Sequence, residues 1–168
     1  MAQRFRGTSR HKVDGKGRVS IPADFRRVLD VQDPDRDPGT NPTVILLHGD
    51  DRHPWYECYS VSSMEEMDAK LDDLEDSDPD RYELLSYFYS TAVTLKIDDS
   101  GRLILSKALR DRIGIADEAV FQARGKTFRI MAPDASDAAA ERLRARLAQM
   151  PDDVPITALL SQKKADGA

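Results

Sequence analysis

One short pattern occurs twice in this chain of 168 residues. It runs VDGKGRVSIP over 13–22, and the second copy runs IDDSGRLILS over 97–106. Both copies place an aspartate, a glycine and an arginine at matching positions before an apolar stretch. A repeated unit of this kind restricts the possible folds, because each unit is one supersecondary structure that needs a neighbour to complete its core.

The first copy predicts a turn followed by a strand. Its four residues 14–17 are rich in turn-forming types, and the residues after them alternate polar and apolar, as in a half-buried strand. Val19 and Ile21 are expected to face the core, which turns Arg18 toward solvent. The next segment places Phe25, Val28 and Leu29 on one side of a helix.

The same order of elements is expected after each copy. Helices are predicted at 23–29 and 107–113, and strands at 43–47, 55–59, 119–123 and 127–131. Ser106 is expected to cap the second helix, while Ser62 or Ser63 is expected to cap the helix after the first copy. We therefore predict a first module at 5–60, a helical connection at 61–93, a second module at 94–133, a C-terminal helix at 134–150 and a flexible tail at 151–168.

Charge is unevenly distributed along the chain. The formal net charge is −5, but residues 1–30 hold eight Lys or Arg and three Asp, whereas residues 31–80 hold three basic and fifteen acidic residues. Charge by region is more informative than the isoelectric point of the whole chain. An acidic protein of this composition can bind DNA if its basic side chains share one surface.

The first turn has the residues of a polyanion-binding site. A glycine such as Gly17 lets the backbone approach a phosphate closely, and Lys16 and Arg18 supply positive charge next to it. Arginine can donate two hydrogen bonds to guanine, and lysine acts as a point charge for phosphates. Further basic side chains just upstream extend the expected patch: Arg4, Arg6, Arg10, His11 and Lys12.

A purely structural interpretation of the two turns stays open. Asp14 and Asp98 can cap their turns, with Arg18 and Arg102 as their surface ion-pair partners. Gly101 then has only a structural role in the second turn. Since exposed ion pairs stabilise a fold weakly, the excess positive charge around the first turn favours binding.

Catalysis has little support in the sequence. A loop containing His48, Asp50, Asp51 and His53 could hold a metal or serve a hydrolase, but a solvated loop between two strands is favoured. The glycines of the first turn join two strands and lack the spacing of a phosphate-binding loop. Cys58, the single cysteine, lies within an apolar strand and is expected to be a buried thiol. We predict no enzyme, no metal site and no cofactor.

The cellular location follows from the same features. No apolar run reaches the 18 residues of a transmembrane helix, and the chain begins with basic residues that no apolar segment follows. A single cysteine is typical of a reducing compartment. We therefore expect a cytoplasmic protein that makes no membrane contact.

Several of these residues together resemble a known family. Phe5-Arg-Gly7, His11, the Asp14–Arg18 turn, Ser20–Ala23 and Phe25-Arg26 are similar to the opening of MraZ proteins. Asp98 and Arg102 in the second turn, the aromatic strand at 55–59 and the acidic helix after it fit the same pattern, which covers about residues 3–150. MraZ proteins are bacterial transcriptional regulators associated with the division and cell-wall gene cluster.

The resemblance implies both a fold and a function. The fold is α+β, with two tandem swapped-hairpin AbrB-like β-barrel modules that are related by a pseudo-two-fold and are each followed by helices. The implied activity is sequence-specific binding of double-stranded DNA at repeated promoter boxes by a ring-shaped homo-oligomer, which represses its own operon and associates with the nucleoid. The second turn has serine where the first has Lys16, so most DNA contact is assigned to the first copy and a contact by Arg102 stays open.

A second interpretation uses the acidic segment at 64–80. Proteins with AbrB-like folds also act as antitoxins, in which an acidic segment covers a toxin. The chain would then be a protein-binding module. The predicted helix caps and the internal position of the segment argue against this alternative.

Overall fold

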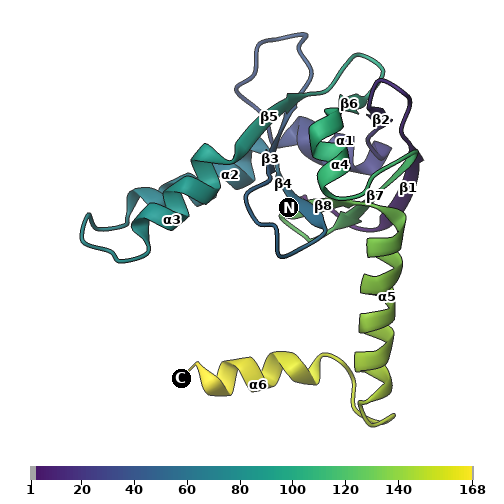
Figure 1. The fold of residues 1–168 in the computed structure, drawn as a ribbon. Coiled ribbons are helices and arrows are strands. Elements are labelled where there is room, and N and C mark those ends of the chain that lie inside the picture. Colours follow the sequence, from purple (N-terminus) through teal and green to yellow (C-terminus); the bar gives the residue numbers. More distant parts are fainter. Residues whose placement is uncertain (1–2, 168) are drawn as a thin grey trace. The chain divides into compact units, whose positions relative to one another are not determined.

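The computed structural model describes residues 3–167 and contains the elements labelled in Figure 1. The first half contains β1 (Thr8–Lys12), β2 (Arg18–Ser20), α1 (Ala23–Val31), β3 (Thr43–Leu47), β4 (Trp55–Tyr59), α2 (Val61–Asp72), α3 (Arg81–Leu85) and the π-helical turn η1 (Ser86–Ser90). The second half contains β5 (Ala92–Lys96), β6 (Arg102–Ile104), α4 (Lys107–Arg112), β7 (Glu118–Ala123), β8 (Thr127–Met131), α5 (Pro133–Ala148) and α6 (Ala158–Asp166). The described residues through Ala135 form one compact unit, and those from Ser136 form another.

Strands from the two halves are intermixed in both sheets. The larger sheet is antiparallel with the order β1-β7-β8-β4-β3-β5, and β2 pairs with β6 in a separate two-stranded sheet. Each strand has a counterpart in the other half: β1 matches β5, β2 matches β6, β3 matches β7 and β4 matches β8. If every strand of the larger sheet is exchanged for its counterpart, the same strand order results, read from the opposite edge. The edge strand of each half therefore pairs with a strand of the other half: β1 with β7, and β5 with β3. Such mutual completion is what a repeated unit is expected to need.

The prediction of closed β-barrels is wrong. The six-stranded sheet is open, because β1 and β5 lie at its two ends and each pairs on one side only. The glycine turn after β1 sends β2 away from it, and the single bridge between them joins Val13 to Val19. Strands of three residues then pair with each other across the halves instead of closing the sheet. The observed architecture is mixed α and β with an antiparallel sheet.

The core between the sheets and α1 is aromatic. Phe5, Phe25, Phe121 and Phe128 are at most 2% exposed, and the rings of Phe5 and Phe128 lie 5.0 Å apart between centroids. Rings at this distance in edge-on geometry stabilise each other beyond the area that they bury. Because these phenylalanines come from both halves of the chain, the core forms only when the halves fold together.

Most local predictions agree with the structure. Val19 and Ile21 are each 1% exposed, and α1 buries Phe25, Val28 and Leu29 as its pattern predicted. Ser106 caps α4, since its hydroxyl accepts a hydrogen bond from the Leu109 amide at 3.3 Å.

The predicted cap of α2 is wrong by two residues or more. Ser60 is the capping residue, and its hydroxyl accepts from the Ser63 amide at 3.1 Å. The helix starts earlier than predicted because Ser60 leaves β4 in an extended conformation and can turn directly into the helix.

The C-terminal region is helical. Residues 133–148 form α5, and α6 lies within the segment that was expected to be loosely ordered. Residues described in α5 have no buried side chain, and Leu143, Leu147 and Leu160 are exposed. Within residues 3–167, no helix combines the length and apolar character needed to cross a bilayer.

Candidate nucleic-acid interface

The two repeated turns have the same hydrogen-bonded geometry. In the first, Asp14 Oδ1 accepts from the backbone amides of Lys16 at 3.0 Å and Arg18 at 2.9 Å. In the second, Asp98 Oδ1 accepts from the amides of Ser100 and Arg102, both at 2.9 Å. A short carboxylate side chain that accepts amides two and four residues on holds a tight turn closed.

The same aspartates hold the arginines that begin the following strands. Arg18 Nε donates to Asp14 Oδ2 at 2.5 Å, and Arg102 Nε donates to Asp98 Oδ2 at 3.1 Å. The amide hydrogen bonds, and then the arginine contacts, lower the pKa of both carboxyl groups. Both carboxylates therefore stay charged at neutral pH and fix the Nε end of each guanidinium.

This arrangement leaves the outer nitrogens of each guanidinium available. Among residues 3–167 no hydrogen bond involves the Nη atoms of Arg18 or Arg102, whose side chains are 36% and 33% exposed. Those two nitrogens form the fork that binds guanine or phosphate in a bidentate manner. The guanidinium is thus oriented by the protein and open toward solvent.

The glycine of each turn contacts the other half of the chain. Gly17 and Gly101 have backbone φ angles of +84° and +77°, which residues other than glycine rarely adopt. The Gly17 carbonyl accepts from the Leu105 amide at 2.8 Å, and the Gly101 carbonyl accepts from the Ile21 amide at 3.0 Å. Each turn is therefore fastened to the residue that follows the ribbon strand of the other half.

Each glycine also lies against an arginine from the opposite half. A Cβ placed on Gly101 would be 2.1 Å from Nη1 of Arg26, and one on Gly17 would be 3.2 Å from Nε of Arg110. Arg110 Nε donates to the Leu105 carbonyl at 3.0 Å, which holds its side chain in place. The first turn thus has Arg18 and, from α4, Arg110, while the second turn has Arg102 and, from α1, Arg26.

Strands β2 and β6 bring the two turn arginines onto one surface. Their register pairs Arg18 with Ile104 and Ser20 with Arg102. Val19 and Leu103 are buried beneath, so alternation turns the four paired residues outward. We call this outward face of Arg18, Ser20, Arg102 and Ile104 the ribbon face.

A hollow of about 460 Å³ adjoins the ribbon face and has mixed charge. Its lining includes three basic residues and three acidic ones: Lys12, Arg18, Arg102, Asp14, Asp117 and Glu118. Two of these acids already have partners, since Asp14 binds Arg18 and Glu118 lies 3.2 Å from Arg10. The charges that line the hollow therefore balance, and the surplus positive charge lies at the tip of the first turn, where Lys16 is exposed.

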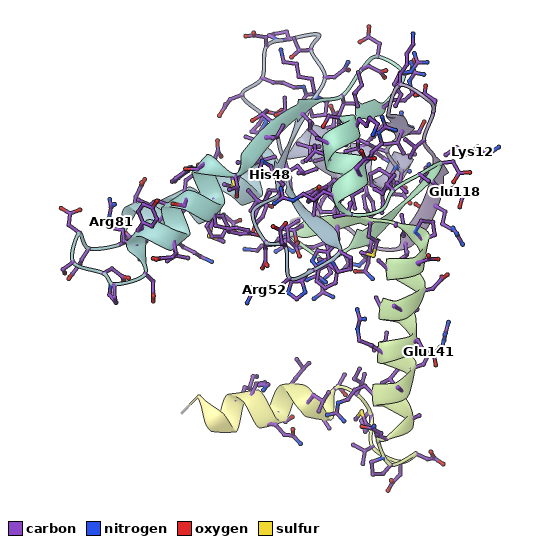
Figure 2. The ribbon with its side chains drawn as sticks, viewed as in Figure 1. Lys12, His48, Arg52, Arg81, Glu118 and Glu141 are labelled. Carbon is purple, nitrogen blue, oxygen red and sulfur yellow. The ribbon has the colours of Figure 1, made fainter. Side chains whose placement is uncertain are left out.

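The upstream basic residues occupy different places. Lys12 and Glu118 are opposite each other where β1 meets β7, as Figure 2 shows, and Arg10 pairs with the same glutamate. Arg6 lies before β1 and follows Phe5, whose amide donates to the Gly125 carbonyl. The whole five-residue strand β1 therefore separates Arg6 from the first turn. At about 3.3 Å per residue this separation exceeds roughly 16 Å. The structure places Lys12 beside the turn, and it does not bring Arg6 there.

Lys16 is exposed at the tip of the first turn. Within the described residues no carboxylate lies within ion-pair distance of its ammonium group. The matching position in the second turn is Ser100, which adds no charge. The first turn is consequently the more basic of the two.

The loop before β4 has its own contacts. Arg52 binds Asp50 through two nitrogens, at 2.9 and 2.7 Å, and Arg112 binds Asp51 at 2.7 Å. His53 stacks on Trp55 with 4.4 Å between ring centroids. Figure 2 shows His48 and Arg52 in this region. In the part of the chain that the structure describes, no three His, Cys, Asp or Glu side chains are arranged to hold a metal.

Cys58 lies in β4 and is buried, as predicted. Burial raises the pKa of its thiol well above the usual value, so the thiolate is disfavoured.

Comparison with known proteins gives a consistent result. A relative from Ruegeria pomeroyi is 45% identical over 157 residues, which cover 91% of this chain and 92% of the relative. A relative from Ruegeria sp. is 43% identical over the same shares, and one from Gluconobacter oxydans is 36% identical over 84% of this chain and 81% of its own. All three are named transcriptional regulator MraZ. This chain belongs to the MraZ family.

Membership of the MraZ family places the chain among transcriptional regulators and agrees with the resemblance found in its sequence. No family model matches the chain, so the assignment depends on these relatives. Their shared name is that of a regulator and not of an enzyme.

Sequence reasoning missed two basic residues in this MraZ chain. Arg26 and Arg110 occupy matching positions in the repeat, and each lies against the turn glycine of the other half. The repeated arginine was itself a signal. Its location was hidden because the contact joins residues that are far apart along the chain.

Proposed function

We propose that this MraZ-family chain binds double-stranded DNA through the ribbon face and represses its own operon. The observation that supports this most is the pair of arginines Arg18 and Arg102, which two halves of the chain place on one two-stranded ribbon with their Nη atoms free. A two-stranded ribbon fits the major groove of B-DNA, where arginine donates to guanine O6 and N7.

The turn tips are proposed to hold the phosphate backbone. Lys16 projects from the first turn as an uncompensated charge, while Arg26 is exposed beside the second turn. Phosphate contacts of this kind position a protein on DNA without reading its sequence. Lys12 adds a contact beside the first turn, whereas Arg10 and Arg6 are expected to contribute less, because one has a carboxylate partner and the other lies at the far end of β1.

The proposed assembly is a ring of copies that engages repeated promoter boxes. One ribbon face offers few contacts, and several faces on one ring gain affinity because each bound face raises the local concentration of the next. Each half of the chain is proposed to correspond to one swapped-hairpin module of the AbrB type. The exchanged pairings β1 with β7 and β5 with β3 support this assignment. Such a repressor would reside with the nucleoid.

The deciding experiment replaces Arg18 by alanine. Arg18→Ala should abolish binding to the DNA upstream of the chain's own gene, measured by mobility shift and footprinting, and it should leave the assembly size unchanged in light scattering. Arg52→Ala is the matched control. Arg52 also pairs with a nearby aspartate, Asp50, but it lies in the loop before β4. Its DNA affinity should equal that of the wild type.

The second arginine is tested in the same assay. Arg102→Ala should weaken binding if both ends of the ribbon touch DNA. Unchanged binding by Arg18→Ala would refute the proposed interface, whatever the result for Arg102.

A further inference from the structure

The ribbon face contains one apolar residue between its polar ones. Ile104 is 56% exposed and lies directly opposite Arg18 in the register of β2 and β6. Residues opposite each other in an antiparallel pair have Cβ atoms about 5 Å apart and act on the same neighbour. The Ile104 side chain therefore starts next to Arg18 on the ribbon face.

On the ribbon face itself, the two ends differ only in this residue. Matching positions of the repeat relate Arg18 to Arg102 and Ser20 to Ile104. One end thus presents an arginine beside an isoleucine, and the other end presents an arginine beside a serine. On the ribbon face, each end therefore has one arginine, but the residues beside the two arginines differ.

We infer that Ile104 contacts the 5-methyl group of a thymine next to the base that Arg18 binds. This inference depends on the proposed DNA binding. The thymine methyl is the apolar group that base pairs expose in the major groove, and apolar side chains recognise it there. Ser20 beside Arg102 offers a hydroxyl instead, which gives no preference for a methyl. Each box is consequently bound in one orientation, although the ribbon itself is nearly symmetric.

A different role for Ile104 has to be separated by the test. The residue also borders an apolar groove of about 710 Å³ that is lined by Val93, Leu95 and Leu109, among others. A second copy of the chain could occupy that groove. The DNA contact is favoured because these three groove residues are less exposed than Ile104, which turns outward beside Arg18.

The experiment compares DNA with and without thymine methyl groups. The region upstream of the chain's own gene is amplified with either dTTP or dUTP, so that the two fragments differ only in the 5-methyl groups. Wild-type protein should bind the uracil fragment about fourfold more weakly for each methyl contacted, the decrease expected for one buried carbon. Ile104→Ser should bind both fragments equally, with an affinity close to that of the wild type for uracil DNA.

Two further variants complete the design. Val31→Ser removes an apolar side chain that is 57% exposed on α1, outside the ribbon face, and should keep the wild-type ratio of affinity for thymine DNA to affinity for uracil DNA. Ser20→Ile places an isoleucine at the other end of the ribbon and should increase this affinity ratio.

The outcomes separate the alternatives. Equal binding of the two fragments by the wild type, or an undiminished ratio in Ile104→Ser, would overturn the inference. A smaller assembly in Ile104→Ser with the ratio retained would also overturn it and assign Ile104 to contact between copies. If the wild type bound neither fragment, the proposed function itself would fail first.

Discussion

The two repeated turns share a backbone and differ in their side chains. Both close on an aspartate, place a glycine at positive φ and lead into an outward arginine. The first turn has Lys16 where the second has Ser100, and Ser20 where the second has Ile104. Residues that hold the turn are thus the same in both copies, while those at its tip and on its strand differ.

This difference distinguishes the residues that hold the fold from those that are free to contact a ligand. The aspartate is required twice because it accepts two amides of its own turn. The glycine is required twice because its carbonyl accepts the amide that follows the ribbon strand of the other half. No such demand acts on the tip residues, which face solvent. A duplicated unit can therefore keep its fold and still give its two ends different ligand contacts.

The largest effect is expected from replacing the turn glycines. Gly17→Ala should lower the free energy of unfolding by about 3 kcal/mol or more, since its Cβ would lie 2.1 Å from the Leu105 carbonyl oxygen, a backbone atom. Gly101→Ala should cost about 1–2 kcal/mol, because its Cβ meets the Arg26 side chain, which can move aside. Urea denaturation measures both. Equal decreases would show that the two turns are packed alike after all.

A smaller effect is expected from exchanging the tip residues. Lys16→Ser should reduce the slope of log affinity against log salt by about 0.9, the change expected when the protein neutralises one phosphate fewer. Ser100→Lys should increase the slope by the same amount if the second turn also lies near the backbone. DNA titrations at several salt concentrations give the slopes. A Lys16→Ser variant with the wild-type slope would contradict the proposed binding of phosphate by Lys16.

The smallest effect is expected from the turn aspartates, which are at the surface. Their pKa values are lowered in the folded chain, so their contribution to stability is present above the usual aspartate pKa of about 3.9 and is lost as the pH falls below it. Asp14→Asn with Asp98→Asn should flatten the decline in stability below about pH 4 while keeping the turns, since an amide oxygen can still accept the backbone hydrogen bonds. Chemical denaturation at a series of pH values measures this, and an unchanged decline would show that other carboxyl groups cause it.

Much of the local structure was predictable from the sequence. Alternation predicted that Val19 and Ile21 face the core, and spacing predicted the buried side of α1. These predictions succeed because periodicity and turn chemistry act within a few residues. The cap of α2 was missed because several serines are adjacent and only the path of the chain out of β4 selects Ser60.

The partners across the two halves could not be predicted in this way. The open sheet, the contact of Arg26 with Gly101 and the pairing of Arg18 with Ile104 all join segments that are distant along the chain. Their geometry depends on how far β2 turns away from β1, which no local pattern specifies.

The sequence by itself determined the repeat, the turns with their aspartate, glycine and arginine, and membership of the MraZ family. The tertiary structure alone decided that the arginines of both copies share one ribbon face, that Arg6 lies far from the turn and that Ile104 is beside Arg18. The reason is physical: short-range hydrogen bonding and hydrophobic periodicity are encoded residue by residue, whereas a shared surface arises only when two halves bury one common core.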